Sequence, residues 1–514
     1  MLRRVRQTLH DNCGLPVALS LLAALAARLA WLAYTRHTSE DAFITFRFAR
    51  QLSQGLGFTY NAGEAIYGTT TPLLTLMLAL WNLVPRADIE SGAHALGLLA
   101  SMGSLVLLDA VLRAERIGAP SRLVVLGVLA FSSKVIVLDM QGMEMPLVIC
   151  LMMASWLAFR RSRPALAGVL AGALLWTRID LALWPAVLVV LEYRRDRRRG
   201  AAMGLAALLT YLPWVAFAYA YFGSPLPFTI TAKQVAHSLS AISIPSELDT
   251  VLGYLSPLDY PLDQKTVFLL AGAATTGLAL WQASRSRRSP ALLALSIFAG
   301  AEAVALVVTR ATFQARYLYP LLWSVLVLAG LGVASLWPTD SRRGYGVASA
   351  VCVLGAAGLI VQSAYVAQRT RAVQVYRYDG SLRAMGAFLA ERGPGSASVL
   401  LEPLGYVGFY SGMHMIDEVG LVSPRVVELK QRGTPVEEYF DVFRPTYVIQ
   451  HCDDAARFEA QQASSGTRFA DEYSRLATFD PLGGEGYSEI RGRYPGLDRS
   501  SCYIIWQQAH PGSG

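Results

Sequence analysis

Residues 15–34 read LPVALSLLAALAARLAWLAY, an apolar stretch with a single charged side chain, Arg28. A helix of roughly 20 such residues is long enough to cross the hydrocarbon core of a bilayer, which is about 30 Å thick. Similar runs recur along the 514-residue chain, and charged residues make up only 16% of it. An average soluble domain carries about 25% charged residues. The sequence therefore predicts a polytopic α-helical membrane protein that lies in a lipid bilayer.

Arginines gather in short clusters, and each cluster borders an apolar run. Cytoplasmic loops of membrane proteins carry an excess of Lys and Arg, so these clusters are expected to face the cytoplasm. They explain the net charge of +8 without nucleic acid as a partner. The clusters are Arg3, Arg4 and Arg6; Arg113, Arg116 and Arg122; Arg160, Arg161 and Arg163; Arg194, Arg195, Arg197, Arg198 and Arg199; Arg285, Arg287 and Arg288; and Arg342 and Arg343.

Residues 72–84 decide the predicted topology, because this apolar stretch is too short for a full span. If it lies along the membrane surface, every arginine cluster falls on the cytoplasmic side of the inner (plasma) membrane. The N-terminus is then cytoplasmic, and residues 15–34 form the first of about eleven spans rather than a cleaved signal peptide, whose apolar core is shorter. The other spans are expected at 91–112, 122–139, 145–159, 164–177, 180–193, 201–221, 265–284, 289–308, 317–337 and 345–366.

Residues 367–514 have the pattern of a small α/β domain on the outer face, following a membrane module of residues 1–366 that includes a first outer loop at 35–90. Cys452 and Cys502 fall in this domain. A disulfide between them is permitted outside the cytoplasm, and the sequence leaves their pairing open. The expected strands are Ser398–Leu401, Tyr447–Gln450 and Tyr503–Trp506, and the expected helices are Ser381–Glu391 and Val436–Val442.

The turn Ser39-Glu40-Asp41 directly follows the first span. Ser39 is expected to cap a helix over Ala42–Gln54, with both carboxylates in its first turn, where acids favour the helix N-terminus. The same carboxylates at a membrane surface also suit a general base that takes a proton from an acceptor hydroxyl. The residues alone leave both interpretations open.

Several cations on the outer side are candidates for phosphate binding. Arg47 shares a helix face with Arg50, and two such guanidinium groups could clamp a phosphate or contact lipid headgroups. Lys233 follows two prolines in PLPFTITAK, which exclude a continuous helix. Arg316 and Arg310 could equally serve as lipid anchors.

Glu144, in QGMEMP, lies between two apolar runs, where a carboxylate is costly unless it is functional or paired. Arg178, in the turn TRID with Asp180, is its expected partner, in a substrate site or in a purely structural pair. Arg28 and Glu302 lie within predicted spans, and the sequence names no partner for either.

No nucleotide-binding loop, zinc-protease motif, nucleophile elbow or Cys/His metal spacing is present. The sequence therefore predicts no metal and no other cofactor.

The stretch Glu40–Leu80, EDAFITFRFARQLSQGLGFTYNAGEAIYGTTTPLLTLMLAL, resembles the first outer loop of polyprenyl-phosphate-dependent GT-C glycosyltransferases. It is most similar to the branch that contains the mycobacterial terminal arabinofuranosyltransferases. GMEMPL, TRIDLAL, PLPFTITAK, ARYLYPLL, GFYSGMHMIDEVGLVSP and FRPTYVI resemble later motifs of that branch in the same order.

This resemblance implies an inverting transferase that moves a sugar from a polyprenyl-phosphate donor to a cell-envelope glycan acceptor. It implies Glu40 or Asp41 as the base, with Asp41 slightly favoured because the family's usual pair is Asp-Asp. Arg47, Glu144, Arg178, Asp180, Lys233 and Arg316 are the implied substrate-binding residues. The Arg178-Ile179-Asp180 turn lacks the family's proline, and the loop before Lys233 lacks its asparagine, which puts the sugar specificity in doubt.

Three alternatives stay open at this point. They are a flippase or transporter of a lipid-linked glycan, an oligosaccharide ligase with a lipid-diphosphate donor, and a membrane scaffold without catalysis. A transporter would usually show inverted repeats and interrupted helices at the membrane midplane, which the sequence does not show.

Overall fold

The structure is a computed structural model that describes residues 14–238, 244–258, 265–286, 289–309, 315–336, 342–393, 397–455, 469–483, 497 and 501–509. The chain forms two compact units. The first unit comprises residues 1–36, 93–214 and 242–368, and the second comprises 37–92, 215–241 and 369–514. The first loop, which the sequence analysis grouped with the membrane module, thus belongs to the same unit as the C-terminal residues.

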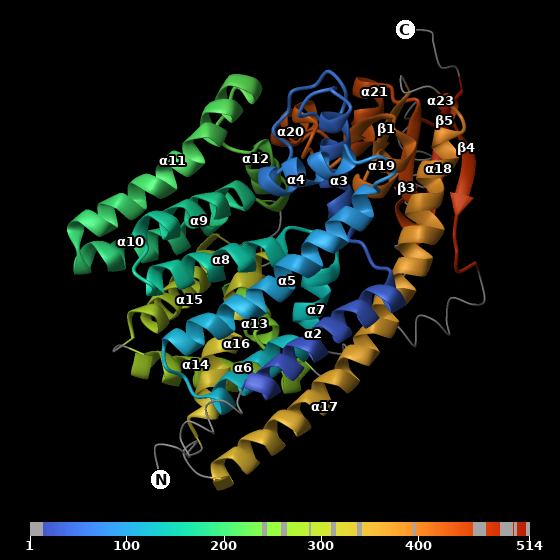
Figure 1. The fold of residues 1–514 in the computed structure, drawn as a ribbon. Helices are drawn as coiled ribbons and strands as arrows, with labels where there is room; N and C mark the ends of the chain where they lie inside the picture. Colours follow the sequence, from blue (N-terminus) through green and yellow to red (C-terminus); the bar gives the residue numbers. More distant parts are fainter. Residues whose placement is uncertain are drawn as a thin grey trace. The chain divides into compact units, whose positions relative to one another are not determined.

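The first unit is helical, and a helix lies over each span expected from the sequence (Figure 1). Six described helices are long and apolar enough to cross a membrane, or seven if the bent pair α6 and α7 is one span. The helices are α2 (Gly14–Thr35), α5 (Ile89–Ala114), α6 (Ala119–Phe131), α7 (Ser133–Met140), α8 (Met145–Arg160), α9 (Pro164–Thr177), α10 (Leu183–Arg195), α11 (Arg197–Phe222), α13 (Ile244–Tyr254), α14 (Lys265–Arg285), α15 (Pro290–Thr309), α16 (Ala315–Ala334) and α17 (Arg342–Val373).

The prediction of one continuous helix over 122–139 is wrong. The segment breaks at Ser132, and α7 is bent by 59° relative to α6. After the break, the Lys134 ammonium donates to the carbonyl oxygens of Gly253 (3.2 Å), Tyr254 (2.9 Å) and Ser256 (3.1 Å). These carbonyls lie at the C-terminal end of α13, where unpaired C=O groups attract a cation. The bend thus gives a buried lysine the partners that a straight helix would not.

Small residues allow close helix packing in the first unit. A β-carbon at Gly172 of α9 would lie 2.5 Å from the carbonyl oxygen of Ala207 in α11. A β-carbon at Gly332 of α16 would lie 2.9 Å from the carbonyl oxygen of Leu278 in α14. Membrane helices pack in this way because lipid supplies little hydrophobic drive for their association.

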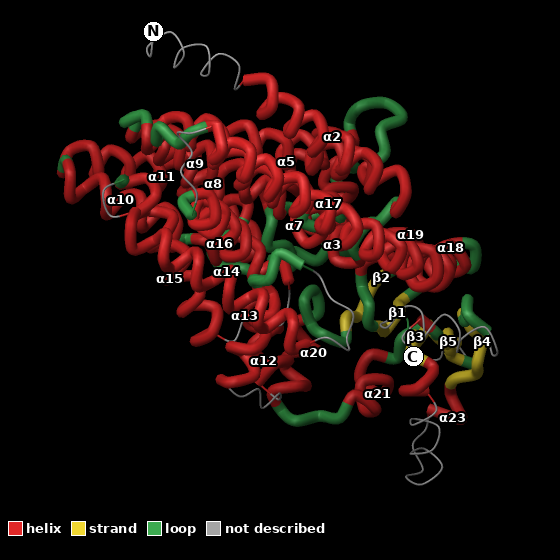
Figure 2. The backbone as a smooth tube through the Cα atoms, turned by 90° about the horizontal axis from the view of Figure 1, so that it is seen from below, coloured by secondary structure: helices red, strands yellow, loops and turns green. Residues whose placement is uncertain are grey.

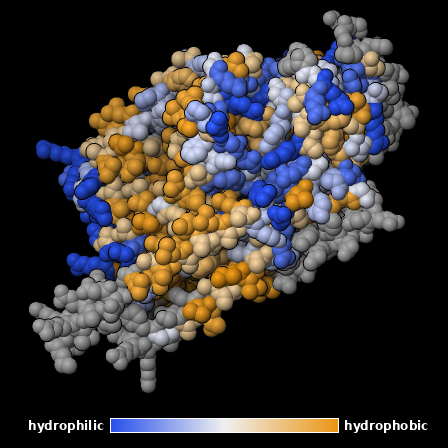
Figure 3. Space-filling model, turned by 45° about the vertical axis from the view of Figure 1, so that its right-hand side comes forward, coloured by the Kyte–Doolittle hydropathy of each residue, from blue (hydrophilic) through white to orange (hydrophobic). Residues whose placement is uncertain are grey.

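Large apolar side chains are exposed on several of these helices. Leu22, Leu209, Leu270 and Val308 are each more than half exposed. Figure 3 shows hydrophobic residues spread over a broad part of the face that it draws. Contiguous apolar surface of this extent is costly in water and is matched by lipid, so the surface suits a polytopic membrane protein.

The second unit combines helices with a five-stranded sheet of order β2-β1-β3-β5-β4 (Figure 2). Strands β2, β1 and β3 are parallel, and β5 is antiparallel to both β3 and β4. The strands are β1 (Ser398–Leu401), β2 (His414–Asp417), β3 (Tyr447–His451), β4 (Tyr473–Phe479) and β5 (Tyr503–Gln508). The helices are α3 (Glu40–Ser53), α4 (Pro72–Asn82), α12 (Phe228–Ser238), the π-helix η4 (Gln374–Arg383), α18 (Ala384–Ala390), α19 (Gly405–Ser411), α20 (Pro424–Gln431), η5 (Val436–Glu438), α21 (Tyr439–Phe443) and α23 (Phe469–Glu472).

The three strands expected from the sequence are confirmed as β1, β3 and β5. The sequence analysis missed β2 and β4. Strand β2 has only four residues, and β4 lies at the sheet edge with a half-exposed side-chain pattern. Neither presents the continuous apolar run that marks a central strand.

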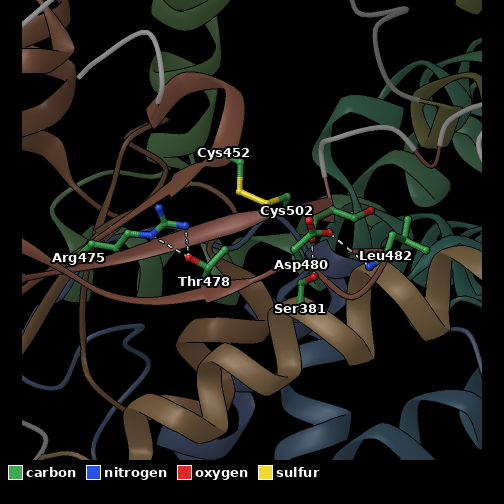
Figure 4. The surroundings of a disulfide bond; sticks show 8 residues. Ser381, Cys452, Arg475, Thr478, Asp480, Leu482 and Cys502 are labelled. Atoms are coloured by element: carbon green, nitrogen blue, oxygen red, sulfur yellow. Dashed lines mark hydrogen bonds between the residues drawn. A yellow bond between two sulfur atoms is a disulfide. The ribbon is translucent and has the colours of Figure 1, made fainter. Parts of the chain in front are cut away.

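Cys452 and Cys502 form a disulfide within the second unit (Figure 4). His451 of β3 pairs with Tyr503 of β5 in the antiparallel register, so the next position on β3 faces Cys502. Their Cα atoms are 5.4 Å apart, a separation that suits a disulfide. The pairing that the sequence left open is therefore present, and it joins two neighbouring strands across 50 residues of sequence.

Candidate active site

The acidic turn lies at the start of α3, which begins at Glu40 as the sequence predicted to within two residues. Ser39 is the N-cap residue in extended backbone conformation, but its side chain makes no capping hydrogen bond. The expected serine cap is therefore wrong. The helix still has acidic residues in its first turn, the position that acidic side chains favour.

Glu40 and Asp41 are both half-buried, and their carboxyl groups are hydrogen-bonded to each other. Glu40 Oε1 also accepts a hydrogen bond from the backbone amide of Gly405. Burial raises the pKa of Glu40 to about 8, and the neighbouring Asp41 carboxylate adds to this shift. Because Glu40 then keeps its proton at neutral pH, Asp41 is the better candidate for a base.

The chain just before the turn is held by hydrogen bonds within the second unit. Thr38 donates from its hydroxyl to Glu90 (2.6 Å), and its amide donates to Gln374 Oε1 (3.2 Å). The Tyr406 hydroxyl donates to the Thr38 carbonyl (3.0 Å). The turn is thus positioned from both sides, as a catalytic carboxylate requires.

Arg47 is only 3% exposed, and its guanidinium group binds backbone oxygens. It donates to the carbonyls of Tyr60 (2.8 Å), Gly408 (2.5 Å) and Met413 (2.7 Å). A buried guanidinium must be satisfied locally, so these bonds occupy the donors that a phosphate would need. The geometry corrects the expectation for Arg47, because it supports a structural link between α3 and residues 408–413.

Arg50, like Arg47, fixes α3 against neighbouring residues and does not line an open site. Its Nη2 donates to the carbonyl of Phe409 (2.6 Å), and its guanidinium lies 3.4 Å from the centre of the Phe409 ring. The guanidinium groups of Arg47 and Arg50 thus both bind backbone carbonyl oxygens, and the structure does not support the predicted phosphate clamp on α3.

In the first unit, the expected pair of Glu144 and Arg178 is confirmed. Arg178 Nη1 donates to Glu144 Oε1 at 2.9 Å, and both side chains are buried. Arg178 also binds both carboxylate oxygens of Asp180, with a shortest distance of 2.6 Å. Two carboxylates on one guanidinium leave little positive charge for a phosphate, so Arg178 organises the turn more than it attracts an anion.

Arg316 lies in the first turn of α16 and is half-buried. Its guanidinium faces the ring of Tyr317 at 5.8 Å, and the Arg178 guanidinium faces the same ring at 4.6 Å. Arg316 Nη1 also lies 3.9 Å from the sulfur of Met143. The structure therefore brings Arg316 together with the Glu144–Arg178 pair. Arg310 lies outside the described residues.

Lys233 lies in helix α12, and not in the stiff loop that the prolines predicted. The helix starts at Phe228, directly after Pro227, and proline is tolerated at a helix start because no N–H is needed there. The loop prediction is therefore wrong at this position. Lys233 is half-buried in the second unit.

Two intramembrane charges have neighbours that the sequence did not reveal. Arg28 is fully buried and forms an ion pair with Asp139 at 3.0 Å. Asp139 also accepts a hydrogen bond from the Tyr319 hydroxyl at 2.6 Å. Glu302, which is 4% exposed, has Arg178 and Asp180 as its charged neighbours. Helices far apart in sequence supply these groups, so no local pattern could have identified the pairs.

Arg377 was not predicted as a site residue, yet it lies within electrostatic reach of Glu40. It belongs to the π-helix η4 and interacts electrostatically with Tyr503. Isolated π-helical turns occur frequently at functional sites. The segment QVYRYDGS gave one signal, a mixture of aromatic and charged residues just after the last predicted span.

Across the part of the chain that the structure describes, no group of three or more His, Cys, Asp or Glu side chains is arranged to hold a metal ion. The charged groups at the candidate site are carboxylates and guanidinium groups.

The sequence of residues 368–503 matches a domain of unknown function, DUF8728. No curated protein matches the chain. The structure is similar to that of ArnT from Cupriavidus metallidurans bound to undecaprenyl phosphate, with a TM-score of 0.59 and 15% identity, over 95% of this chain and 97% of that chain.

A second similar structure is the oligosaccharyltransferase of Archaeoglobus fulgidus in its apo form. The TM-score is 0.58 at 12% identity, over 85% of this chain and 69% of that chain. The same enzyme tethered to an acceptor peptide gives a TM-score of 0.54, over 90% of this chain and 73% of that chain. The chain therefore has the GT-C fold, a polytopic helical membrane protein with a small C-terminal α/β domain.

Proposed function

We propose that this protein is an inverting glycosyltransferase that moves a sugar from a polyprenyl-phosphate donor to a glycan acceptor of the cell envelope. The supporting observation is the fixed acidic turn at Glu40 and Asp41 within a GT-C fold. ArnT, which shares this fold along nearly its whole length, binds undecaprenyl phosphate. The transferred sugar is an arabinofuranose-like sugar, as the resemblance of the loop at residues 40–80 implies, or another sugar.

In the proposed reaction, Asp41 takes the proton of an acceptor hydroxyl. The acceptor oxygen then attacks the anomeric carbon on the face opposite the phosphate. The bond between that carbon and the phosphate oxygen breaks, and polyprenyl phosphate leaves with the bonding electrons. One displacement inverts the anomeric configuration, and the proton ends on Asp41.

Cations stabilise the charge that develops on the leaving phosphate. The resemblance implies Lys233 and Arg316 for this role. Lys233 is half-buried in the unit that contains Asp41, and Arg316 is half-buried beside Tyr317 in the first unit. Glu144, Arg178 and Asp180 shape the donor site around Arg316. Because cations of the chain can carry this role, we expect transfer to need no metal and to continue in a metal chelator.

The acidic turn and residues 367–514 are proposed to lie on the periplasmic or extracellular face, with the N-terminus in the cytoplasm. The arginine clusters support this orientation. The Cys452–Cys502 disulfide also fits an oxidising compartment outside the cytoplasm.

The test is transfer of labelled sugar by the purified protein from synthetic polyprenyl-phosphate sugars, including an arabinofuranose donor, to envelope glycan fragments. We expect Asp41→Asn to lower kcat by about 10²–10⁴-fold, the usual contribution of a general base. Glu428→Gln, a change at an exposed carboxylate of α20, is the matched control. Transfer at the wild-type rate by Asp41→Asn would remove the proposed base.

A ligase with a lipid-diphosphate donor is the second candidate, because the archaeal oligosaccharyltransferase shares the fold over 85% of this chain. Offering lipid-monophosphate and lipid-diphosphate sugars in parallel separates the two. Activity with the diphosphate donor alone would favour the ligase. Movement of the lipid across vesicles without sugar transfer would favour a flippase.

A further inference from the structure

Gly405 allows α19 to approach the acidic turn more closely than any other residue would. Its amide donates to Glu40 Oε1. A β-carbon at position 405 would lie 2.6 Å from that same oxygen and would also meet the Glu40 carbonyl oxygen. Contacts this close cannot persist, so alanine there would separate the amide from the carboxyl group.

The segment that carries this amide is itself fixed to α3. The Tyr60 hydroxyl donates to the carbonyl of Leu404 at 2.8 Å, and Arg47 donates to the carbonyl of Gly408 at 2.5 Å. These bonds bracket Gly405 on both sides. The Glu40 carboxyl group thus meets a donor whose position is set by the sheet domain, while it is also hydrogen-bonded to Asp41.

We propose that Glu40 is a positioning residue, which accepts a hydrogen bond from the Gly405 amide and donates one to Asp41, and so orients the Asp41 carboxylate toward the acceptor hydroxyl. This inference rests on the proposed function, because it assigns to Asp41 the role of base. It also gives residues 368–503 a part in the site, since they supply the amide that holds Glu40.

The surroundings of Glu40 keep its carboxyl group protonated at neutral pH, which is the form that this role needs. A protonated carboxyl group can donate and accept at once, whereas a carboxylate only accepts. Burial and the charge of Asp41 raise the pKa of Glu40 to about 8, so the proton stays on at neutral pH. The titratable groups that act on Glu40 are Asp41 of α3, Tyr60 of the following loop, Arg377 and Tyr378 of η4, and Tyr503 of β5.

The experiment compares two substitutions in the full-length protein. Glu40→Gln preserves both hydrogen bonds, because the amide N–H replaces the carboxyl O–H and its carbonyl accepts from Gly405. We expect kcat to fall by no more than about threefold. Glu40→Ala removes both bonds, and we expect kcat to fall about 10–100-fold with little change in KM, as for the loss of a charge-assisted hydrogen bond.

The pH profile distinguishes positioning from simple packing. In the wild type, transfer should decline above about pH 8, because ionised Glu40 no longer donates to Asp41 and repels it. In Glu40→Gln this decline should be absent, since the amide does not ionise. The control Glu428→Gln should follow the wild-type profile.

Three results would overturn the proposal: Glu40→Gln as inactive as Glu40→Ala, Glu40→Ala as active as the wild type, or an alkaline decline that persists in Glu40→Gln. Asp41→Asn, measured in parallel, separates this failure from failure of the proposed function. If Asp41→Asn is inactive while both Glu40 variants match the wild type, only the positioning role fails. If Asp41→Asn transfers sugar normally, the base and the positioning role both fail.

Discussion

The acidic turn of α3 and the Glu144–Arg178–Asp180 cluster each contain two carboxyl groups. The two sites differ in the groups that bind these carboxyls, and Asp180 is exposed whereas the other three are half-buried or buried. In the cluster, one guanidinium binds both carboxylates with distances down to 2.6 Å. In the turn, Glu40 is met by a backbone amide and by Asp41.

The difference has a chemical consequence. In the cluster each carboxylate is bonded to a guanidinium group, whereas in the turn two carboxyl groups lie next to each other, and Asp41 raises the pKa of Glu40. The cluster is therefore suited to hold structure, and the turn is suited to move a proton. Residue type alone does not separate these roles, since both sites contain one Glu and one Asp.

The largest expected effect comes from breaking the cluster. Arg178→Ala leaves the buried Glu144 carboxylate without its cation, which should destabilise the protein by about 3–5 kcal/mol. Thermal unfolding of the detergent-solubilised protein measures this. Adding Glu144→Gln to the same chain should restore part of the loss, because it removes the unpaired charge. A double variant no more stable than Arg178→Ala would show that the pair does not act through charge.

Disrupting the contact between Glu40 and the Gly405 amide should destabilise the protein less than Arg178→Ala does. Gly405→Ala forces α19 away from Glu40, and overpacking of this kind costs about 1–3 kcal/mol. Gly483→Ala is the matched control, because a β-carbon there meets only one atom, at 3.9 Å. We expect Gly405→Ala to lower kcat as well as the unfolding temperature. If Gly405→Ala and Gly483→Ala had the same kcat and the same unfolding temperature, the close approach of Gly405 to Glu40 would be refuted.

Arg316→Ala sharpens the comparison, because it removes a cation that shares the Tyr317 ring with Arg178 of the cluster. We expect KM for the lipid donor to rise about tenfold, since an Arg–phosphate bond contributes about 1.5 kcal/mol or more. The unfolding temperature should change little. A loss of stability with unchanged KM would assign Arg316 a structural role instead.

The last expected effect is the pH dependence of stability at Glu40, which is spread over several pH units. Its pKa is raised by folding, so the stability that it permits is fully present below its unfolded pKa near 4.5 and decreases as pH rises toward 8. Glu40→Gln lacks this dependence. The unfolding temperature of Glu40→Gln relative to the wild type should therefore increase steadily between pH 5 and pH 8. A constant difference over that range would contradict a buried, neutral Glu40.

Local sequence patterns were enough to identify most helices of the first unit, the strands β1, β3 and β5, and the acidic turn, but they missed α13 and the break between α6 and α7. Each is encoded within one segment, by a run of apolar residues or by adjacent charges, and the hydrophobic effect acts on such runs wherever they occur. The pair of Glu144 and Arg178 could also be predicted, because both residues lie in short polar turns between apolar runs, where a charge needs a partner.

Tertiary structure decided the remaining questions, because they depend on contacts between distant residues. Arg47 looked like an anion ligand until its donors met the carbonyls of Gly408 and Met413. Glu40 and Asp41 are adjacent in sequence, but burial in the folded chain raises the pKa of Glu40, and the Gly405 amide, 365 positions away, opposes part of that rise. Burial and hydrogen bonding set which carboxyl group is charged, and both are properties of the folded chain.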